Sequence, residues 1–402
     1  MKRIFYIPEE LVEEILVRLP PKSLMRFKCV CKSWYALITD PSFANKHLRF
    51  GIDNSKKSSS VSLFLSWTRQ ELSLDHIFNH RFYGDLDKVF SLVSVCDEDD
   101  SNNSHLPCVV QEINLPPTLK HDTDSFINSH CNGIICWFNR SGFCGEIFLC
   151  NPSLNEFKLL HTPSLLPEFW PSGFGFGYDA RANDYKFVKL FRSAYNPIAS
   201  RALVYTLGID SWKEIKMDLK GKFCLADAKG VYCRGVYYWV NKAVPGREDM
   251  ILSFDMSDEV FHTIALPDCI KRVDGQSPKR LALWNESLVL FFTPANSWFS
   301  TSFEMWVMAD NVGGVEGVTW TKHLTIRPQR FIHLYSTLTF WKDDEILFET
   351  RDGRLVSYNL YSQKLRKLPI HGAVLPGRTS AHLYLKSLVS VRGGTHAKQP
   401  QN

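Results

Sequence analysis

The first fifty residues carry apolar side chains at a helical spacing. The segment Ile7–Glu10 (IPEE) has the features of a helix start, because proline fits the first turn and two carboxylates there face the positive end of the helix dipole. The apolar positions that follow predict one stripe on that helix, made of Leu11, Val12, Ile15, Leu16 and Leu19. The two prolines after Leu19 are expected to end the helix.

Further short helices are predicted before residue 50. Their apolar positions are Leu24, Phe27, Val30 and Cys31, and then Trp34, Leu37 and Ile38. Asp40 and Pro41 fit the N-cap and first position of a last helical turn that holds Phe43 and Leu48. So short a segment has more apolar positions than its own core can use. We therefore expect it to complete its burial on a partner.

After the helices, the pattern changes to short strands. Residues 50–60 are predicted to be a linker, polar and low in complexity from Asp53 onward. From Val61 on, one unit recurs: an apolar strand, a polar turn, and a strand marked by an aromatic residue or leucine. The third residues of five such units are Asn151, Thr206, Asp255, Met308 and Asn359. Their spacing of about 50 positions is typical of kelch-type β-propellers.

The predicted fold class is α+β, with a small helical unit over residues 4–49 and an all-β, propeller-like (kelch-like) domain of six or seven blades over 61–391. A closed ring needs the two ends of the β region to meet, since closure removes exposed sheet edges. We expect Val61–Trp67 and Leu383–Val391 to be strands that share a blade. Residues 392–402 have little to bury and are expected to form a disordered tail.

Composition and charge exclude several classes of protein. The 402 residues include 28 Phe, 14 Tyr and 11 Trp, which favours β-structure. No run of 18 apolar residues and no signal peptide is recognisable, so we expect no membrane association and a cytoplasmic, or also nuclear, protein with reduced cysteines. Residues 1–50 carry a net charge of +4 of the total +5, and a β domain without a basic excess argues against nucleic-acid binding.

The helical segment closely resembles the F-box. The resemblance rests on Ile7–Pro20 (IPEELVEEILVRLP) and Lys22–Trp34 (KSLMRFKCVCKSW). It implies docking on the Skp-type adaptor of a cullin–RING ubiquitin ligase, with the cullin scaffold as a further partner. The positions it assigns to adaptor contact or to packing of the F-box helices are Pro8, Leu11, Ile15, Leu16, Leu19, Pro20, Leu24, Phe27, Val30, Cys31 and Trp34. The alternative is a small helical bundle that caps the β domain.

The positive charge of the F-box segment includes Lys22, Arg26, Lys28 and Lys32. Their charge suits an acidic adaptor surface.

The β region is similar to the F-box-associated domain of plant F-box proteins, in particular to the S-locus F-box and S-locus F-box-like group. The segments that carry this resemblance include Cys131–Cys136 (CNGIIC), Gly175–Asp179 (GFGYD), Ile251–Asp255 (ILSFD), Met305–Met308 (MWVM) and Leu338–Trp341 (LTFW). The resemblance implies a substrate-recognition subunit that binds pistil S-ribonucleases in pollen. The same ligase role with another intracellular plant target, such as an immune receptor, is an alternative. A small-molecule or glycan-binding propeller is a further one.

No motif predicts catalysis, a metal site or a cofactor. His76 and His80 have the i, i+4 spacing of a metalloprotease helix, but Ile77 stands where that motif has glutamate. The cysteines include no paired Cys-x₂-Cys. The glycines at 173, 175 and 177 alternate, which predicts a strand whose glycine face lets neighbouring rings approach closely. We expect a non-catalytic receptor subunit.

Two kinds of residue are candidates for contact with a protein target. A run of four carboxylates is suited to attracting a basic partner, and exposed aromatic residues are suited to anchoring an interface. The candidates are Asp97, Glu98, Asp99, Asp100, Phe169, Trp170, Trp298 and Phe299.

Overall fold

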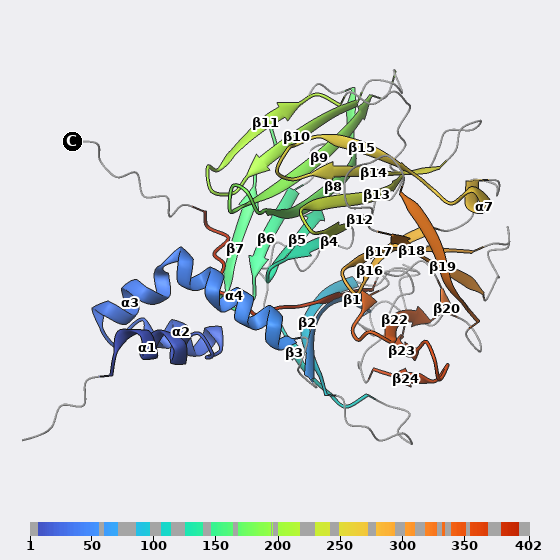
Figure 1. Ribbon diagram of the computed structural model, residues 1–402. Helices are drawn as coiled ribbons and strands as arrows, with labels where there is room; N and C mark the ends of the chain where they lie inside the picture. Colours follow the sequence, from blue (N-terminus) through green and yellow to red (C-terminus); the bar gives the residue numbers. More distant parts are fainter. Residues whose placement is uncertain are drawn as a thin grey trace, which may run out of the picture.

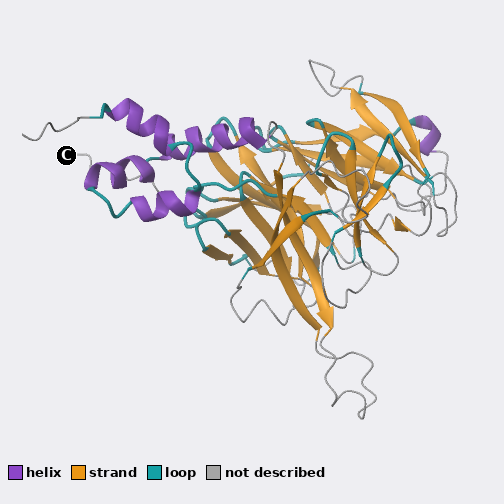
Figure 2. Ribbon diagram, turned by 90° about the horizontal axis from the view of Figure 1, so that it is seen from below, coloured by secondary structure: helices purple, strands orange, loops and turns teal. Residues whose placement is uncertain are grey.

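The computed structural model shows four helices beside a ring of β-sheets (Figures 1 and 2). It describes residues 7–55, 60–70, 86–96, 106–113, 125–139, 146–163, 168–193, 195, 200–217, 230–241, 249–271, 279–293, 302–309, 318–327, 332–333, 339–350, 354–368 and 379–393.

The helical unit is built from α1 (Glu9–Leu16), α2 (Pro21–Phe27), α3 (Lys32–Thr39) and α4 (Pro41–Ser55). Pro8 is the N-cap of α1, and Glu9 and Glu10 lie in its first turn, as the sequence predicted. Pro20 stands before α2 in an extended conformation and separates it from α1. In the part of the chain that the structure describes, no helix has both the length and the apolar character needed to cross a membrane.

Two expectations for the helices are corrected. Val30 and Cys31 do not lie on the buried side of a helix, because α2 ends at Phe27 and both residues are exposed before α3 begins. The last helix is longer than one turn. Asp40 caps it, with Oδ1 accepting from the backbone N–H of Ser42 at 2.7 Å. The helix then continues to Ser55, so the first part of the predicted linker 50–60 is helical.

The described strands form six antiparallel sheets, which confirms a six-bladed propeller. The first blade holds β25 (Ser380–Leu383), β1 (Ser60–Gln70), β2 (Leu86–Cys96) and β3 (Cys108–Glu112). The second holds β4 (Ser125–Cys131), β5 (Ile134–Asn139), β6 (Glu146–Asn151) and β7 (Glu156–Leu160). The third holds β8 (Phe169–Asp179), β9 (Asp184–Ser193), β10 (Ser200–Thr206) and β11 (Ser211–Ile215).

The other three blades follow in chain order. The fourth holds β12 (Gly230–Cys233), β13 (Val236–Asn241), β14 (Met250–Asp255) and β15 (Phe261–Ala265), followed by the short helix α7 (Asp268–Lys271). The fifth holds β16 (Lys279–Trp284), β17 (Ser287–Phe292), β18 (Phe303–Ala309) and β19 (Thr319–Ile326). In the sixth, β20 (Ile332–His333) and β21 (Thr339–Phe340) both pair with β22 (Glu345–Thr350), and β23 (Leu355–Asn359) and β24 (Leu365–Lys367) complete the sheet.

The ring closes by pairing the two ends of the β region. β25 pairs with β1, with Phe64 opposite His382 and Leu65 opposite Ala381. The predicted shared blade is therefore present, but its carboxyl-terminal strand is Ser380–Leu383 and not Leu383–Val391. The backbone N–H of Tyr384 still donates to the Ser62 carbonyl of β1 at 2.8 Å. Residues 385–391 leave the sheet because their apolar side chains pack elsewhere: Leu388 contacts the helical unit and Val391 the core of the second blade.

The repeat seen in the sequence is the turn between the third and fourth strands of a blade. Asn151, Thr206, Asp255 and Asn359 each end a third strand, and Met308 lies one residue before the end of another. The side chains of Asp255 and Asn359 accept hydrogen bonds from backbone N–H groups two and three residues further on. Such side chains stabilise a tight turn, which explains why these positions recur.

Candidate functional site

Three apolar side chains are exposed at the start of the helical unit: Leu11 and Ile15 on α1, and Ile7 just before its N-cap Pro8. Ile7, Leu11 and Ile15 are spaced four residues apart, and each is 55% exposed. Residues four apart lie one above the other on a helix. An isolated exposed aliphatic residue is ordinary, but Leu11 and Ile15 share one face of α1 and Ile7 is exposed just before it, which is the kind of surface that a protein partner covers.

The buried side of α1 determines which of its side chains face outward. Leu16 and Val17 are almost fully buried in the core of the helical unit. At the edge of the helix, Lys46 Nζ on α4 lies 2.9 Å from an oxygen of both Glu13 and Glu14, and the hydrogen bond from Lys46 lowers the pKa of the Glu14 carboxyl. Exposed ion pairs contribute little stability, so burial of the inner side chains holds α1 in place.

A second exposed apolar pair lies where α3 begins. Val30 is 59% exposed and Tyr35 is 56% exposed. Between them, Cys31 is the N-cap residue of α3, and its Sγ lies 3.2 Å from Oγ of Ser33. This hydrogen bond lowers the pKa of the Cys31 thiol. The helical unit thus has apolar side chains exposed on both α1 and the start of α3.

Three of the four predicted cations are exposed on α2 and α3. Lys22, Arg26 and Lys32 are exposed and have no ion pair within the described residues. Lys28 is half-buried, and burial lowers its pKa while Glu156 on β7 opposes that change. The helical unit therefore presents positive charge together with apolar residues.

The eleven predicted adaptor residues fall into two groups. Those on the surface are Pro8, Leu11, Ile15, Pro20, Val30 and Cys31. Those inside the helical unit are the buried Leu16 and Leu24 and the half-buried Leu19, Phe27 and Trp34. Sequence reasoning missed Ile7 and Tyr35, although the spacing of Ile7 four residues before Leu11 could have pointed to the first of them.

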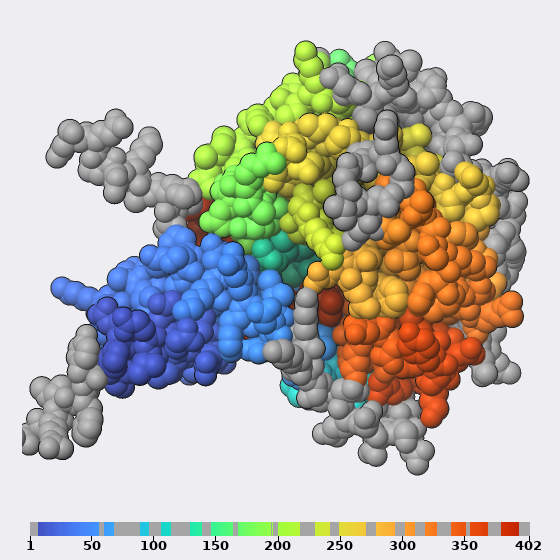
Figure 3. Space-filling model, viewed as in Figure 1, coloured from blue at the N-terminus to red at the C-terminus, as the bar shows by residue number. Residues whose placement is uncertain are grey.

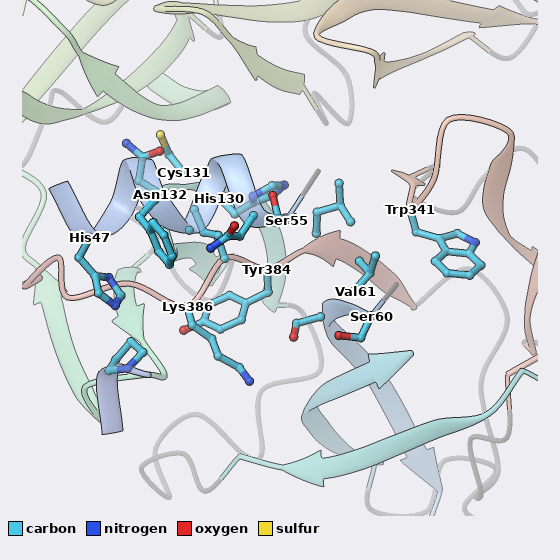
Figure 4. A pocket seen from close by; sticks show the side chains of 18 of the residues that line it. His47, Ser55, Ser60, Val61, His130, Cys131, Asn132, Trp341, Tyr384 and Lys386 are labelled. Atoms are coloured by element: carbon cyan, nitrogen blue, oxygen red, sulfur yellow. The ribbon is translucent and has the colours of Figure 1, made fainter. Parts of the chain in front are cut away.

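A cavity of about 690 Å³ opens where α4 meets the ring (Figures 3 and 4). Two of its histidines are held neutral at neutral pH. Burial lowers the pKa of His47, opposed by a hydrogen bond to the carbonyl of Leu19, and burial lowers the pKa of His130 to about 4. Within the described residues, no three His, Cys, Asp or Glu side chains are grouped to hold a metal ion.

Of the candidate target contacts, Trp170 is the most open among those described. It is 50% exposed at the start of β8, whereas Phe169 is half-buried with the Arg201 guanidinium 4.6 Å from its ring centre. The other end of β8 leads to the turn in which Asn183 accepts a hydrogen bond from Asn45 on α4 at 3.2 Å. Trp170 therefore lies at the end of β8 remote from the helical unit. The candidates outside the described residues are Asp97, Glu98, Asp99, Asp100, Trp298 and Phe299, and so are His76 and His80.

The eight cysteines whose side chains the structure describes are all free. Cys131, Cys136 and Cys150 are buried within strands of the second blade, and burial raises the pKa of each thiol. They act as small apolar side chains of that blade, as the sequence predicted.

A closed six-bladed ring with an exposed helical docking unit at one side defines a two-part binding protein. Comparison with protein families identifies both parts: residues 4–46 match the F-box domain, and residues 85–391 match the F-box associated beta propeller domain. The chain belongs to the family of F-box proteins that carry this propeller domain.

Relatives in Arabidopsis thaliana support this placement over almost the whole chain. An F-box/kelch-repeat protein is 27% identical over 96% of this chain and 95% of its own length. A putative F-box protein is 28% identical over 70% of this chain and 68% of its own.

Solved structures resemble the chain more distantly. A nidogen/laminin complex chain covers 80% of this chain and 98% of its own length, with a TM-score of 0.41 and 10% identity. A SapL1 lectin in complex with alpha methyl fucoside covers 72% and 93%, with a TM-score of 0.42 and 9% identity. Likeness at this level says nothing about what this chain binds.

Proposed function

We propose that this chain is the substrate-recognition subunit of an SCF-type cullin–RING ubiquitin ligase. The F-box docks on a Skp-type adaptor, and the propeller binds a protein target for ubiquitylation. The observation that supports this most directly is the exposure of Ile7, Leu11 and Ile15, each 55% exposed at or just before α1, while Leu16 and Val17 are buried in the core of the helical unit. The exposed cations on α2 and α3 suit an acidic adaptor.

In this proposal the chain is a non-catalytic receptor. Ubiquitin transfer belongs to the conjugating enzyme of the complex, and the receptor contributes by raising the local concentration of target lysines. The protein would work in the cytoplasm, and also in the nucleus.

The adaptor contact is tested with the double variant Leu11→Asp, Ile15→Asp in the full chain. We expect its affinity for a purified Skp-type adaptor to fall at least about thirtyfold, because two anchors of the apolar contact become charged. Isothermal titration calorimetry of the wild type and the variant measures the change.

The matched control is Tyr361→Asp, which places the same charge at a 70% exposed aromatic residue on the sixth blade. It should bind the adaptor like the wild type. Equal affinity of the α1 double variant and the wild type, or no binding by a folded wild type, would refute adaptor docking through α1.

For the target, we propose an S-ribonuclease recognised in pollen, with an immune receptor or another intracellular plant protein as the alternative. The similarity of segments such as CNGIIC and GFGYD to the S-locus F-box group supports the first target. Trp170 is our candidate anchor, because its exposed ring lies at the end of β8 remote from the F-box.

A binding assay between the full chain and purified S-ribonucleases separates these targets. We expect saturable binding that weakens about tenfold or more in Trp170→Ala, the effect of removing one interface anchor. Absence of binding to a panel of S-ribonucleases, by a chain that still binds the adaptor, rules out this target and leaves the ligase role intact.

A further inference from the structure

The last described segment of the chain lies between the propeller and the F-box. We call residues 384–393 the strap. The strap follows β25; the backbone N–H of Tyr384 still donates to the Ser62 carbonyl of β1 at 2.8 Å, and no strand is assigned in the rest of the strap. In Figure 1 it leaves the ring and passes along α4 toward the carboxyl terminus. Contacts on both of its sides show what it joins.

Buried hydrogen bonds attach the strap to the second blade. Asn151, at the end of β6, is fully buried, and its Nδ2 donates to the carbonyl oxygens of Val389 at 2.7 Å and Ser387 at 3.2 Å. At the start of the strap, the Tyr384 hydroxyl lies 2.8 Å from Oγ of Ser153, two residues after Asn151. Hydrogen bonds inside a low-dielectric interior are costly to break. These bonds therefore hold the strap in a fixed position on the second blade.

The following residues of the strap are tied to β7. The Ser390 hydroxyl and the Val391 backbone N–H both donate to Oε2 of Glu156, at 2.7 and 3.1 Å. Val391 itself is fully buried in the core of the second blade.

The opposite side of the strap completes the core of the F-box. Leu388 is 8% exposed and packs in the same cluster as Leu16, Leu24 and Phe43 of the helices. Leu154, from the turn between β6 and β7, packs against this cluster as well.

The strap also approaches α4 and the β4–β5 turn closely. A Cβ at Gly51 on α4 would lie 3.4 Å from Cδ1 of Leu385. A Cβ at Gly133 would lie 2.4 Å from the Leu385 carbonyl oxygen. The helices, the strap and the second blade are therefore packed into one another and not merely joined by a linker.

A comparison between blades shows that the role of Asn151 is particular to this position. Asn359 occupies the same place in the sixth blade, where its Oδ1 accepts from the turn N–H groups and its Nδ2 donates to Asp344 of its own blade. In the same way, Oδ1 of Asn151 accepts a hydrogen bond from the backbone N–H of Ser153. Its Nδ2, however, is directed to the strap.

We infer that the strap is a clasp that fixes the orientation of the F-box relative to the propeller, with Asn151 and Leu388 as its positioning residues. The distance and angle between the adaptor-docking surface and the far face of the ring are then set by the carboxyl-terminal segment. This inference concerns the chain's own architecture and can fail or hold independently of adaptor binding.

The main experiment compares the full chain with Asn151→Ala and with a chain ending after Leu383, which keeps β25 and ring closure. Hydrogen exchange with mass spectrometry should show amide exchange in α4 and, where present, in 384–393 at least tenfold faster than in the wild type. Distances between dyes attached through unnatural amino acids at the exposed positions Tyr35 and Val260 should change from one narrow distribution to a broad one.

The matched control is Asn359→Ala, which removes the equivalent turn amide without touching the strap. It should accelerate exchange only around β23 and β24 and leave the dye distances unchanged. Both variants lose an amide side chain from a turn. If that loss only destabilised the ring, both variants would be less stable than the wild type, and the dye distances would stay unchanged in both.

Two outcomes would overturn the clasp. One is a narrow, wild-type distance distribution in the chain that ends after Leu383. The other is unchanged exchange in α4 for a folded Asn151→Ala variant. Leu388→Ala gives a third measurement with the ring contacts kept, and unchanged exchange in the F-box helices there would show that the strap does not support their core.

Discussion

Two glycines of β8 show how single residues permit the close packing of neighbouring blades. A Cβ added at Gly175 would lie 2.7 Å from the ring of Tyr237, and one at Gly177 would lie 2.3 Å from the ring of Tyr232. Both tyrosines belong to the fourth blade. Neither glycine has a positive φ, so backbone conformation does not require glycine here. Glycine is required because the tyrosine rings occupy the space that a Cβ would need.

We expect Gly177→Ala to destabilise the protein by about 1–3 kcal/mol, the usual cost of forcing extra atoms into a packed interior. Chemical denaturation measures the change. The control is Gly51→Ala in α4, where the new methyl group makes an ordinary contact at 3.4 Å and alanine is the better helix former. That variant should be neutral or stabilising by up to about 1 kcal/mol. Equal costs for the two would contradict the packing explanation.

The alternating glycines could be interpreted from the sequence, but their partners could not. Period two indicated a strand with one face open to close approach. The rings of Tyr232 and Tyr237 come from a strand pair more than fifty residues later, and only the packing of neighbouring blades brings them against β8. The same limit applies to α1. Its apolar positions predicted a helix, but the sequence could not show that Leu388, from the far end of the chain, packs in the same core as Leu16.

At the scale of elements, a buried ionic network joins the third and fourth blades. Lys186 Nζ on β9 lies 2.7 Å from Asp179 and 2.9 Å from Glu259, and Asp179 also accepts from the Ser257 hydroxyl at 2.7 Å. Burial alone would raise the pKa of Asp179, but the hydrogen bonds from Lys186 and Ser257 outweigh it and lower this pKa to about 2.

We expect Asp179→Ala to lower the free energy of unfolding by about 1.5–3 kcal/mol, because it removes a charge-assisted hydrogen bond from the buried Lys186 ammonium, which keeps Glu259 as its other carboxylate partner. The control Asp258→Ala breaks an exposed pair with Arg181 and should cost less than about 1 kcal/mol. A loss at Asp179 no larger than at Asp258 would show that the network contributes little.

The same carboxylate gives a pH dependence with a definite sign. Its pKa is lower in the folded chain than the value of about 3.9 in an unfolded one. Its contribution is therefore complete above about pH 4 and is lost as the pH falls toward 2. Unfolding midpoints measured across this range should fall more steeply for the wild type than for Asp179→Ala. Parallel curves would contradict the assignment.

The hairpin units could be predicted because their contacts join residues close in the sequence. The strap could not be predicted, since its contacts join residues far apart in the sequence. A turn such as Asp255–Glu259 depends on residues a few positions apart, so its chemistry recurs visibly in the sequence. Residues 384–391 have the apolar content of a strand, and the sequence predicted one. Asn151 and Leu16, more than 230 residues earlier, supply the competing contacts.

At the scale of the whole molecule, the ring separates two surfaces. The F-box lies beside the short turns that include Asn183, and Trp170 lies at the other end of the same strand. A strand of 11 residues spans about 36 Å at ~3.3 Å per residue. Figures 1 and 2 show the helices to one side of the ring from both directions. An adaptor and a target could thus be bound together without competing for surface.

The last described strand pairs the two ends of the ring. β25 fills the innermost place of the first blade, Ala381 is fully buried there, and its carbonyl accepts from the Thr339 hydroxyl of the sixth blade at 2.6 Å. Without this strand, β1 exposes an unpaired edge. The first and sixth blades also share an apolar core, in which Leu63 and Val93 pack in one cluster with Trp341 and Leu347. β25 therefore contributes part of the free energy of closure, in a segment that a peptide can replace.

We expect a chain that ends before Thr379 to lose most of its cooperative unfolding transition and to aggregate, whereas a chain that ends after Gly393 should unfold like the full chain. A synthetic peptide covering residues 379–393, added to the shortened chain, should bind it and raise its melting temperature in a concentration-dependent way. A peptide with Ala381→Asp is the control, because a carboxylate at that buried position cannot be accommodated. Normal unfolding of the chain without β25, or equal rescue by both peptides, would show that the remaining strands close the ring by themselves.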